Sequence, residues 1–333
     1  TIEGTSGARS TIINNGTGNV NIEGGTIKNS IAHNGTGTIK MTGGEIVTSN
    51  CNGIENNSTG TVLIENGTIN ADGAYAICNN STGNVKITNG PIVGNNTSYR
   101  DSKRSVIINK STGIIEVEGG NIQTNNCAYV IYNAAEGIIS IGKKDGNVST
   151  EEPIFTNTTY TAIYNQLGMV RFYDGLLKSK KETVLGEISE VEDGYNISTT
   201  TVNELNVTKL EKAENVAQIG DTYYDTLQKA VDSCSKNAGE ETTEIKILKD
   251  ISIIENSVEV TDGQNIKINL NGHKIENFVS TGAIINDGTL EICDDLNTGY
   301  INGYIDEVTI MNNNKLLISS GTIKATQIRT DAT

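Results

Sequence analysis

The sequence contains no tryptophan, three phenylalanines and two prolines, and aromatic residues make up 5% of its 333 residues. A compact globule of this length normally depends more heavily on aromatic bulk. Basic residues are also scarce, since 25 Lys and Arg stand against 40 Asp and Glu, giving a formal charge of −15. This balance argues against binding to nucleic acid and against docking on an anionic membrane. No run approaches the roughly 20 apolar residues of a membrane-spanning helix.

Residues that build common reactive centres are few as well. Two histidines, His33 and His273, exclude a multi-histidine zinc site, and no glycine-rich phosphate loop lies between a strand and a helix. The five cysteines are odd in number and form no CxxC pair, so we expect buried, unpaired thiols. We therefore expect no metal and no cofactor. No signal peptide opens the chain, and residue 1 is expected to be a cut or processed end.

Glycine is abundant, with 36 residues, and it is arranged in a repeat. The stretch STIINNGTGNVNIEGGTI at 10–27 recurs as GIENNSTGTVLIENGTI at 53–69 and AICNNSTGNVKITNGPI at 76–92. One glycine of each copy serves as its anchor: Gly18, Gly37, Gly60, Gly83 and Gly113, with looser copies at Gly137 and Gly168. The anchors are 19 to 31 residues apart, which is the period of a solenoid coil.

Apolar residues lie two and four positions after each anchor, as Val62 and Ile64 do after Gly60. A spacing of two is typical of a strand, and the β-branched side chains favour the same structure. Each copy therefore predicts short strands joined by tight turns, stacked on the next copy about 4.8 Å away. The fold class that follows is an all-β parallel β-helix, in which a coil needs its neighbours to bury its apolar face.

Asparagine occupies a constant place in the copies, two residues after an inward apolar residue such as Ile54 or Ala32. It tolerates left-handed backbone, bonds its own turn and can bond the asparagine of the next coil. We expect a ladder at one corner, with the glycines supplying positive φ and His33 pointing outward. Its members would be Asn14, Asn34, Asn56, Asn79, Asn109, Asn133 and Asn165, with Asn286 and Asn312 further along the chain.

The repeat fades from about residue 178 and starts again later. A short amphipathic helix is predicted near 225–236, capped by Asp225 or Thr226, and a strand follows at 244–250. A helix placed before widening β-coils covers the open end of a β-helix core. We therefore predict two segments. Residues 1–210 form about seven to eight coils of C-terminal type, and residues 215–333 form an N-terminal type that begins with the capping helix.

Three motifs stand one after another in the second segment: YDTLQKA at Tyr224–Ala230, LKD at Leu248–Asp250 and INLNGHKI at Ile268–Ile275. Together they resemble the opening module of right-handed parallel β-helix regions in bacterial secreted and cell-surface proteins, whose architecture is similar to that of pectate lyases. The resemblance implies a right-handed coil and an extracellular or cell-surface location. Its motifs are specific for fold and location and weak for activity.

The resemblance also raises polysaccharide cleavage, which in pectate-lyase-like enzymes uses clustered Asp for calcium and an Arg or Lys base. Asp294 and Asp295 are adjacent, so in a strand they face opposite ways, and in a turn they cap backbone. Glu23, Glu65 and Glu118 share an outward column on alternate coils, about 10 Å apart. That separation is marginal for an inverting glycosidase. We expect a solvated face and no catalytic residue.

Aromatic and basic side chains are the remaining candidates for ligand binding. Tyr132 and Tyr164 each precede a ladder asparagine, so they are expected outward on successive coils, near Tyr160. Stacked tyrosines there can hold a sugar ring or a protein partner, or pack across coils to shield strand edges. The insert at 95–104 lengthens one coil, as either a binding loop or a solvated one. It adds Tyr99, Arg100, Lys103 and Arg104.

These features predict a structural or adhesive role for an extracellular bacterial surface or appendage protein, a stiff spacer with carbohydrate as a candidate ligand. The alternative is a polysaccharide lyase or glycoside hydrolase, because the fold alone does not decide activity. Thr1-Ile2 and the stretch SSGTI at 319–323 both resemble coil tails. We therefore expect copies to stack head to tail into an open fibre, unless the chain is a piece of a longer array.

Overall fold

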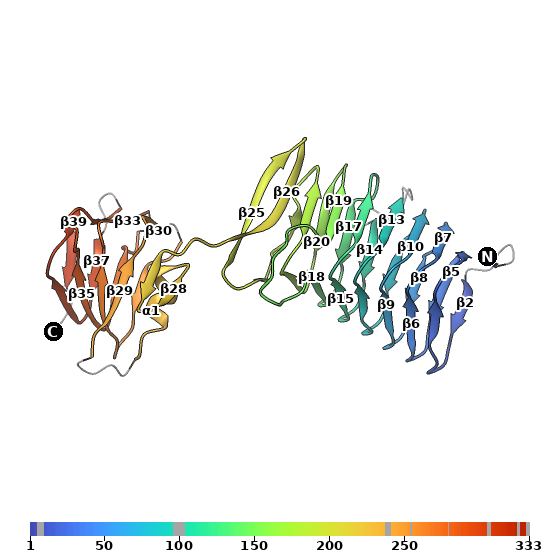
Figure 1. The fold of residues 1–333 in the computed structure, drawn as a ribbon, viewed down its shortest axis with the longest axis horizontal. Coiled ribbons are helices and arrows are strands. Elements are labelled where there is room, and N and C mark those ends of the chain that lie inside the picture. The colour runs from blue at the N-terminus through green and yellow to red at the C-terminus, as the bar shows by residue number, and fades with distance from the viewer. Residues whose placement is uncertain are drawn as a thin grey trace. The chain divides into compact units, whose positions relative to one another are not determined.

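A computed structural model describes residues 1–4, 10–95, 104–236, 241–253, 255–278, 280–304 and 308–324, and the backbone of 327–330. The chain divides into two compact units, Thr1–Lys212 (unit 1) and Ala213–Thr333 (unit 2). Each unit has its own apolar core. In both units short strands stack as successive rungs, as Figure 1 shows.

In each coil of unit 1 the chain passes through three sheets, B, C and A, in turn. Sheet B contains β2 (Ser10–Asn14), β5 (Ser30–His33), β8 (Ile54–Asn56), β11 (Ile77–Asn79), β14 (Ser105–Asn109), β17 (Tyr129–Asn133), β20 (Thr161–Asn165) and β23 (Val184–Leu185). Sheet C contains β3 (Val20–Ile22), β6 (Thr38–Met41), β9 (Thr61–Ile64), β12 (Val85–Ile87), β15 (Ile114–Val117), β18 (Ile138–Ile141), β21 (Met169–Phe172) and β24 (Glu190–Val191). Sheet A contains β1 (Ile2–Glu3), β4 (Thr26–Lys28), β7 (Glu45–Ser49), β10 (Thr68–Asp72), β13 (Pro91–Asn95), β16 (Asn121–Thr124), β19 (Ile154–Asn157), β22 (Leu176–Ser179), β26 (Leu205–Lys212) and β25 (Tyr195–Val202).

Unit 2 repeats this plan with sheets D, E and F. Sheet D contains β28 (Thr222–Tyr224), β27 (Ala217–Ile219), β29 (Thr243–Ile247), β32 (Asn265–Asn269), β35 (Thr289–Cys293) and β38 (Lys315–Ile318). Sheet E contains β30 (Ile251–Ile253), β33 (Lys274–Asn277), β36 (Tyr300–Asn302) and β39 (Thr322–Lys324). Sheet F contains β31 (Val258–Val260), β34 (Ile284–Asn286), β37 (Val308–Asn312) and β40 (Gln327–Thr330).

The register of the coils places like residues over like. In sheet A, Ile69 pairs with Ile46 on one side and with Ile92 on the other, in parallel. All three side chains are 0% exposed. Aliphatic columns of this kind fill the space between the three sheets, because each strand turns alternate residues inward. The prediction of an all-β parallel β-helix is confirmed.

Glycine serves two different purposes in a coil. The anchor Gly83 does not have positive φ. A Cβ on Gly83 would lie 2.2 Å from the Gly60 carbonyl oxygen and 2.5 Å from Asn56 Nδ2 of the preceding coil. Positive φ occurs instead seven residues after these anchors, at Gly67 (105°) and Gly90 (102°). The expectation that glycines supply positive φ is therefore met at these turn glycines. At the anchor Gly83, by contrast, close approach between coils is what excludes a side chain.

Unit 1 ends in a hairpin that the repeat pattern did not predict. β25 and β26 pair antiparallel with each other, and β26 pairs antiparallel with β22. Asn203 and Glu204 form the turn with φ of 49° and 64°. Leu210 of β26 is 1% exposed and packs in the core of unit 1, so the hairpin contributes to the closure of that core.

Unit 2 begins with the hairpin of β27 and β28 and with the short helix α1 (Leu227–Asp232). The predicted cap is confirmed, because Thr226 Oγ1 accepts a hydrogen bond from the Lys229 N–H at 3.1 Å. Asp225 instead binds Lys229 Nζ at 2.8 Å. The buried face includes Leu227 and Val231. The helix is shorter than the predicted 225–236, since it ends in a turn at Ser233.

All five cysteines are free, and four of them are buried, as the odd count predicted. Burial raises the pKa of the Cys78, Cys234 and Cys293 thiols. Among the described residues, no helix has the length and apolar character needed to cross a membrane.

Candidate functional site

An inner asparagine ladder follows one corner of unit 1, at the ends of the sheet B strands. Asn56 Nδ2 donates to Asn79 Oδ1 at 3.0 Å, and Asn79 Nδ2 donates to Asn109 Oδ1 at 3.0 Å. The ladder continues to Asn133 (3.1 Å) and Asn165 (2.9 Å). The predicted ladder is confirmed over these coils, and its amides are buried except for the half-buried Asn165.

Each ladder amide also closes its own turn. Asn79 Nδ2 donates to the carbonyl oxygen of its anchor Gly83, four residues on, at 2.9 Å. Asn14 makes the same bond to Gly18 at 2.8 Å. The two N–H groups of one amide nitrogen therefore serve two acceptors, one in the same coil and one in the next.

The second coil departs from the prediction. His33 is aligned with Asn56 and is 0% exposed, whereas Asn34 is exposed. His33 Nε2 donates to the Gly37 carbonyl oxygen at 2.9 Å, which is the turn bond that asparagine makes elsewhere. The assignments of Asn34 to the inner ladder and of His33 to the outside are wrong. The ladder position lies four residues before the anchor glycine in this coil too, and the inward residue before it is Ile31.

The imidazole interrupts the side-chain ladder. An imidazole nitrogen carries one hydrogen at most, and His33 uses the hydrogen of Nε2 on its own turn. Consequently Asn56 Oδ1 and His33 Nδ1 are buried without a hydrogen-bond partner. At this coil boundary the inner ladder therefore lacks the amide–amide bond that joins the following coils.

A second, outer asparagine ladder runs beside the first and was not predicted. Asn34 Nδ2 donates to Asn15 Oδ1 (2.9 Å), Asn57 Nδ2 to Asn34 Oδ1 (3.0 Å), and Asn80 Nδ2 to Asn57 Oδ1 (2.8 Å). These side chains are exposed. The signal was the doubled asparagine of the repeat, because the residue after an inward one must face outward.

Unit 2 carries a shorter ladder at the corresponding place. Asn286 Nδ2 donates to Asn312 Oδ1 at 2.6 Å, and both residues are buried as predicted. Asn312 Nδ2 in turn donates to the Asn314 carbonyl oxygen at 2.7 Å. In the preceding coil Val260 takes the ladder position, so this ladder begins at Asn286.

The predicted tyrosine column lies on the outer face of sheet B but is largely covered. Tyr132 and Tyr164 are register partners whose rings stack at 5.1 Å between centroids, with 12° between planes. Tyr132 is only 2% exposed and packs with Cys78 and Ile108. Tyr129, which the sequence analysis missed, lies 5.0 Å from the Tyr164 ring. The arrangement is that of packing across coils, and Tyr132 does not present an open ring face.

Of the other binding candidates, Tyr160 and Arg104 belong to the described residues and the rest do not. Tyr160 is 42% exposed, and its backbone N–H donates to Asn157 Oδ1 at 2.9 Å. Arg104 is half-buried, and its carbonyl oxygen accepts from the Tyr129 N–H at 3.0 Å. The remaining residues of the insert, Tyr99, Arg100 and Lys103, lie outside the described residues.

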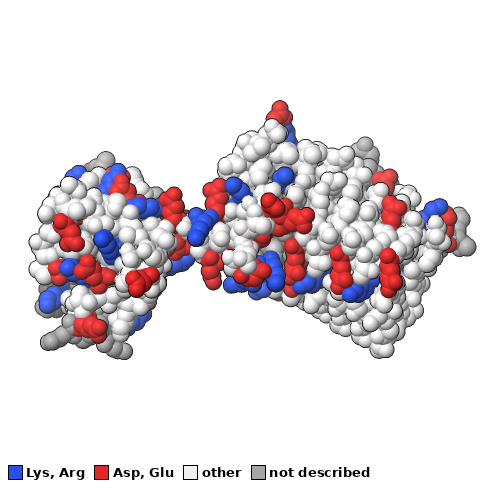
Figure 2. Space-filling view, viewed as in Figure 1, with Lys and Arg blue, Asp and Glu red and all other residues white. Residues whose placement is uncertain are grey.

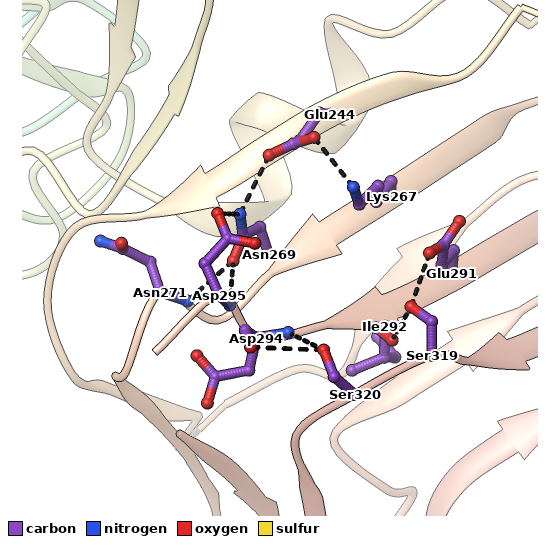
Figure 3. Close-up of polar contacts among 10 residues, drawn as sticks. All are labelled: Glu244, Lys267, Asn269, Asn271, Glu291, Ile292, Asp294, Asp295, Ser319 and Ser320. Carbon is purple, nitrogen blue, oxygen red and sulfur yellow. Dashed lines mark hydrogen bonds and ion pairs between the residues drawn. The ribbon is translucent and has the colours of Figure 1, made fainter. Parts of the chain in front are cut away.

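Asp294 and Asp295 follow β35 in the turn drawn in Figure 3. Asp294 is 1% exposed, and its carboxylate accepts from the backbone N–H groups of Gly272 (2.6 Å), Gly299 (2.6 Å) and Leu296 (3.3 Å). Burial alone would raise the pKa of Asp294, but these backbone donors outweigh it and hold the pKa below its usual value. The side chain caps a turn.

Asp295 belongs to a second polar chain in the same view (Figure 3). Asn269 Nδ2 donates to Asp295 Oδ2 at 2.8 Å and to Glu244 Oε1 at 3.0 Å. This amide, with help from Lys267 at 3.1 Å, lowers the pKa of Glu244. Within the described ranges, no three or more His, Cys, Asp or Glu side chains form a group that could hold a metal ion.

Two members of the carboxylate column beside sheet C are paired with lysines. Lys40 Nζ lies 2.9 Å from Glu65, and Lys86 Nζ lies 2.6 Å from Glu118. Glu23, in the first full coil, is exposed. Figure 2 shows acidic and basic side chains interspersed over unit 1. This arrangement is a solvated face with cross-coil ion pairs, in which each of the two paired carboxylates lies beside a lysine.

No family model matches the chain, and neither the curated proteins nor the solved structures contain a significant match to it. The ladders, the cores and the side-chain clusters described above are therefore the basis for inferring function.

Proposed function

We propose that this chain is a structural or adhesive protein of the bacterial cell surface or extracellular space, in which a stiff β-solenoid presents loops to a partner. The observation that carries the proposal is the continuity of unit 1. Sheets B and C each run through eight strands without a break, and side-chain amides tie the coils from Asn56 to Asn165. Coils bonded to both neighbours resist bending together. The likeness of 224–275 to opening modules of secreted β-helix regions supports the location.

Electron micrographs of the purified chain test the mechanical part of this proposal. Unit 1 is expected to appear as a straight, rigid particle, and a bent or collapsed unit 1 would contradict the proposal. Antibody labelling of intact source cells, compared with permeabilised cells, tests the location. Labelling that requires permeabilisation would contradict a surface protein.

Carbohydrate is the ligand class that we propose for the outer face of unit 1. Tyr160 supports it, because a ring that is 42% exposed can stack on a sugar. Screening against a glycan array tests the idea, with Tyr160→Ala expected to weaken any binding. Tyr223→Ala, at a 55% exposed tyrosine in unit 2, is the matched control. Equal binding by both variants would exclude a role for Tyr160.

We propose a non-catalytic role because the candidate carboxylates already serve the fold. Asp294 caps a turn, and Glu65 and Glu118 are held by lysines. Assays on polygalacturonate and host glycans, with and without calcium, are expected to show no cleavage. The non-catalytic role would be overturned by cleavage that a single substitution among the candidate carboxylates abolishes. These carboxylates are Glu23, Glu65, Glu118, Asp294 and Asp295.

Stacking of copies end to end belongs to the same proposal. Ile2 of β1 ends one core column and is 53% exposed. Ile318 of β38 ends another column and is 41% exposed. A second copy could continue these ladders, as could further coils of a longer polypeptide. Light scattering over a concentration series is expected to show growth that a proline at Ile2 or Ile323 prevents. A monomer at all concentrations would exclude stacking of this chain.

A further inference from the structure

Unit 2 has three edge strands on the side of α1, and the chain itself covers two of them. At sheet D, β27 pairs antiparallel with β29. At sheet F, the Gln228 side chain of α1 replaces a strand. Its Oε1 accepts from the Glu259 N–H at 2.7 Å, and its Nε2 donates to the Glu259 carbonyl oxygen at 3.1 Å. One amide thus satisfies both backbone groups of an edge residue.

The third edge, β30 of sheet E, pairs only with β33 within the part of the chain that the structure describes. The Ile253 carbonyl oxygen accepts from the Phe278 N–H at 2.9 Å, so Ile253 directs its backbone groups toward β33. Ser252, the preceding residue, therefore directs its N–H and C=O to the open side. Ile251 is half-buried, although its column partner Ile275 is 0% exposed.

A groove of about 640 Å³ lies along this edge, within the size range of ligand sites. Its apolar lining includes the buried side chains of Leu227, Ile253 and Val258. One lysine also lines it, Lys249, whose ammonium lies 2.5 Å from Glu214. Three carboxylates line it as well: Asp225, Asp250 and Glu255.

We propose that this groove binds an extended peptide that adds a strand parallel to β30, with an aliphatic side chain over Ile251 and basic side chains toward the acidic residues. We assign the parallel orientation because every pair of sheet E is parallel. Sheet D differs, since its edge strand β29 is covered by the antiparallel β27. The aliphatic requirement follows from the isoleucine column that the new strand would extend. In such strand addition, backbone bonds supply affinity and side-chain positions supply specificity. The column consists of Ile251, Ile275, Ile301 and Ile323.

Fluorescence anisotropy with the full chain tests this proposal. The probe is a labelled peptide with blocked ends, Lys-Thr-Ile-Lys-Val-Lys, and saturable binding is expected. Ser252→Pro removes the outward N–H and leaves the backbone groups of Ile253 in place, so it should weaken binding at least about tenfold. Ser252→Ala keeps that N–H and should bind like the parent. The peptide methylated on its backbone nitrogens should not bind.

Glu255→Lys is the second variant, in case the proline disturbs folding. It reverses one carboxylate at an exposed turn and should weaken binding of the basic peptide while leaving the unfolding midpoint unchanged. Absence of saturable binding to the parent chain would overturn the proposal. So would equal affinity of the parent, Ser252→Pro and Glu255→Lys, because that result describes unspecific attraction to an acidic protein.

Discussion

A buried ladder amide is bonded on three sides, so its loss leaves several groups without partners. Asn79 accepts from Asn56, donates to Asn109 and donates to the Gly83 carbonyl oxygen. We expect Asn79→Ala to lower the free energy of unfolding of unit 1 by about 1–3 kcal/mol, measured by denaturant titration. The control is Asn80→Ala in the exposed outer ladder, which should change it by less than about 0.5 kcal/mol. Equal midpoints for the two variants would contradict the stabilising role of the inner ladder.

His33 is a residue whose replacement should strengthen unit 1. An asparagine there would carry a second N–H on the nitrogen that bonds Gly37, and this N–H could reach Asn56 Oδ1, which now has no partner. We expect His33→Asn to raise the free energy of unfolding by about 1 kcal/mol. The midpoint of denaturant unfolding measures it. An unchanged or lower midpoint would show that the imidazole fills this corner better than an amide.

Most ladder residues could be predicted from the sequence, but the prediction for the second coil was wrong for a physical reason. Asn34 was selected because of its residue type, yet the spacing of four to the anchor points to His33. Turn geometry fixes which side chain faces the corner, and residue type then decides how well it bonds there. For Tyr132 the sequence left two interpretations open, ligand binding and packing across coils, and the structure shows the packing. The sequence alone did not decide between them, because an outward side chain is covered only through neighbours on other coils.

At the scale of the strand and turn, close approach between coils should make anchor glycines unequal. A Cβ on Gly83 would meet backbone oxygens of the preceding coil at 2.2 and 2.4 Å, whereas a Cβ on Gly18 would meet nothing within 4 Å. We expect Gly83→Ala to cost more than about 2 kcal/mol and Gly18→Ala to be nearly neutral, by denaturant unfolding. If both substitutions lowered the free energy of unfolding by similar amounts, backbone conformation, and not the lack of room for a Cβ, would explain glycine at these positions.

The turn after β35 should make unit 2 sensitive to acid. The pKa of Asp294 is lowered in the folded state because its backbone donors outweigh burial. Its contribution to stability is therefore present above the unfolded value of about 3.9 and is lost as pH falls through the folded value. We expect Asp294→Asn to flatten the fall in stability below about pH 4. Asp221→Asn, at an exposed turn, is the control and should leave that fall unchanged.

Elements with a strict period were predictable, and elements held by distant pairing were not. The coils and the helix near Thr226 follow from spacing and capping, and both are present. The hairpin of β25 and β26 escaped prediction because its turn, at Asn203 and Glu204, contains no glycine. Its strands also leave the coil period, and their place on β22 depends on a contact that local sequence does not encode.

At the scale of the whole chain, the separate cores predict separate folding. No buried residue is shared between the core clusters of unit 1 and unit 2. We expect residues 1–212 and 213–333, produced separately, each to show the strand spectrum and hydrogen-exchange protection that they have in the full chain. Loss of protection in either part alone would show that the units need each other.

Repetition of the ladder contacts has a consequence for heredity. The step from Asn56 to Asn79 is 23 residues, as is the step from Asn57 to Asn80. A tandem duplication of that stretch in the gene would set each new side chain against partners of its own kind. Unit 1 would lengthen by one coil, about 4.8 Å, without any new kind of contact between coils. Unequal crossing-over can therefore change the length of unit 1 in steps of one coil, by adding or removing copies of the repeat.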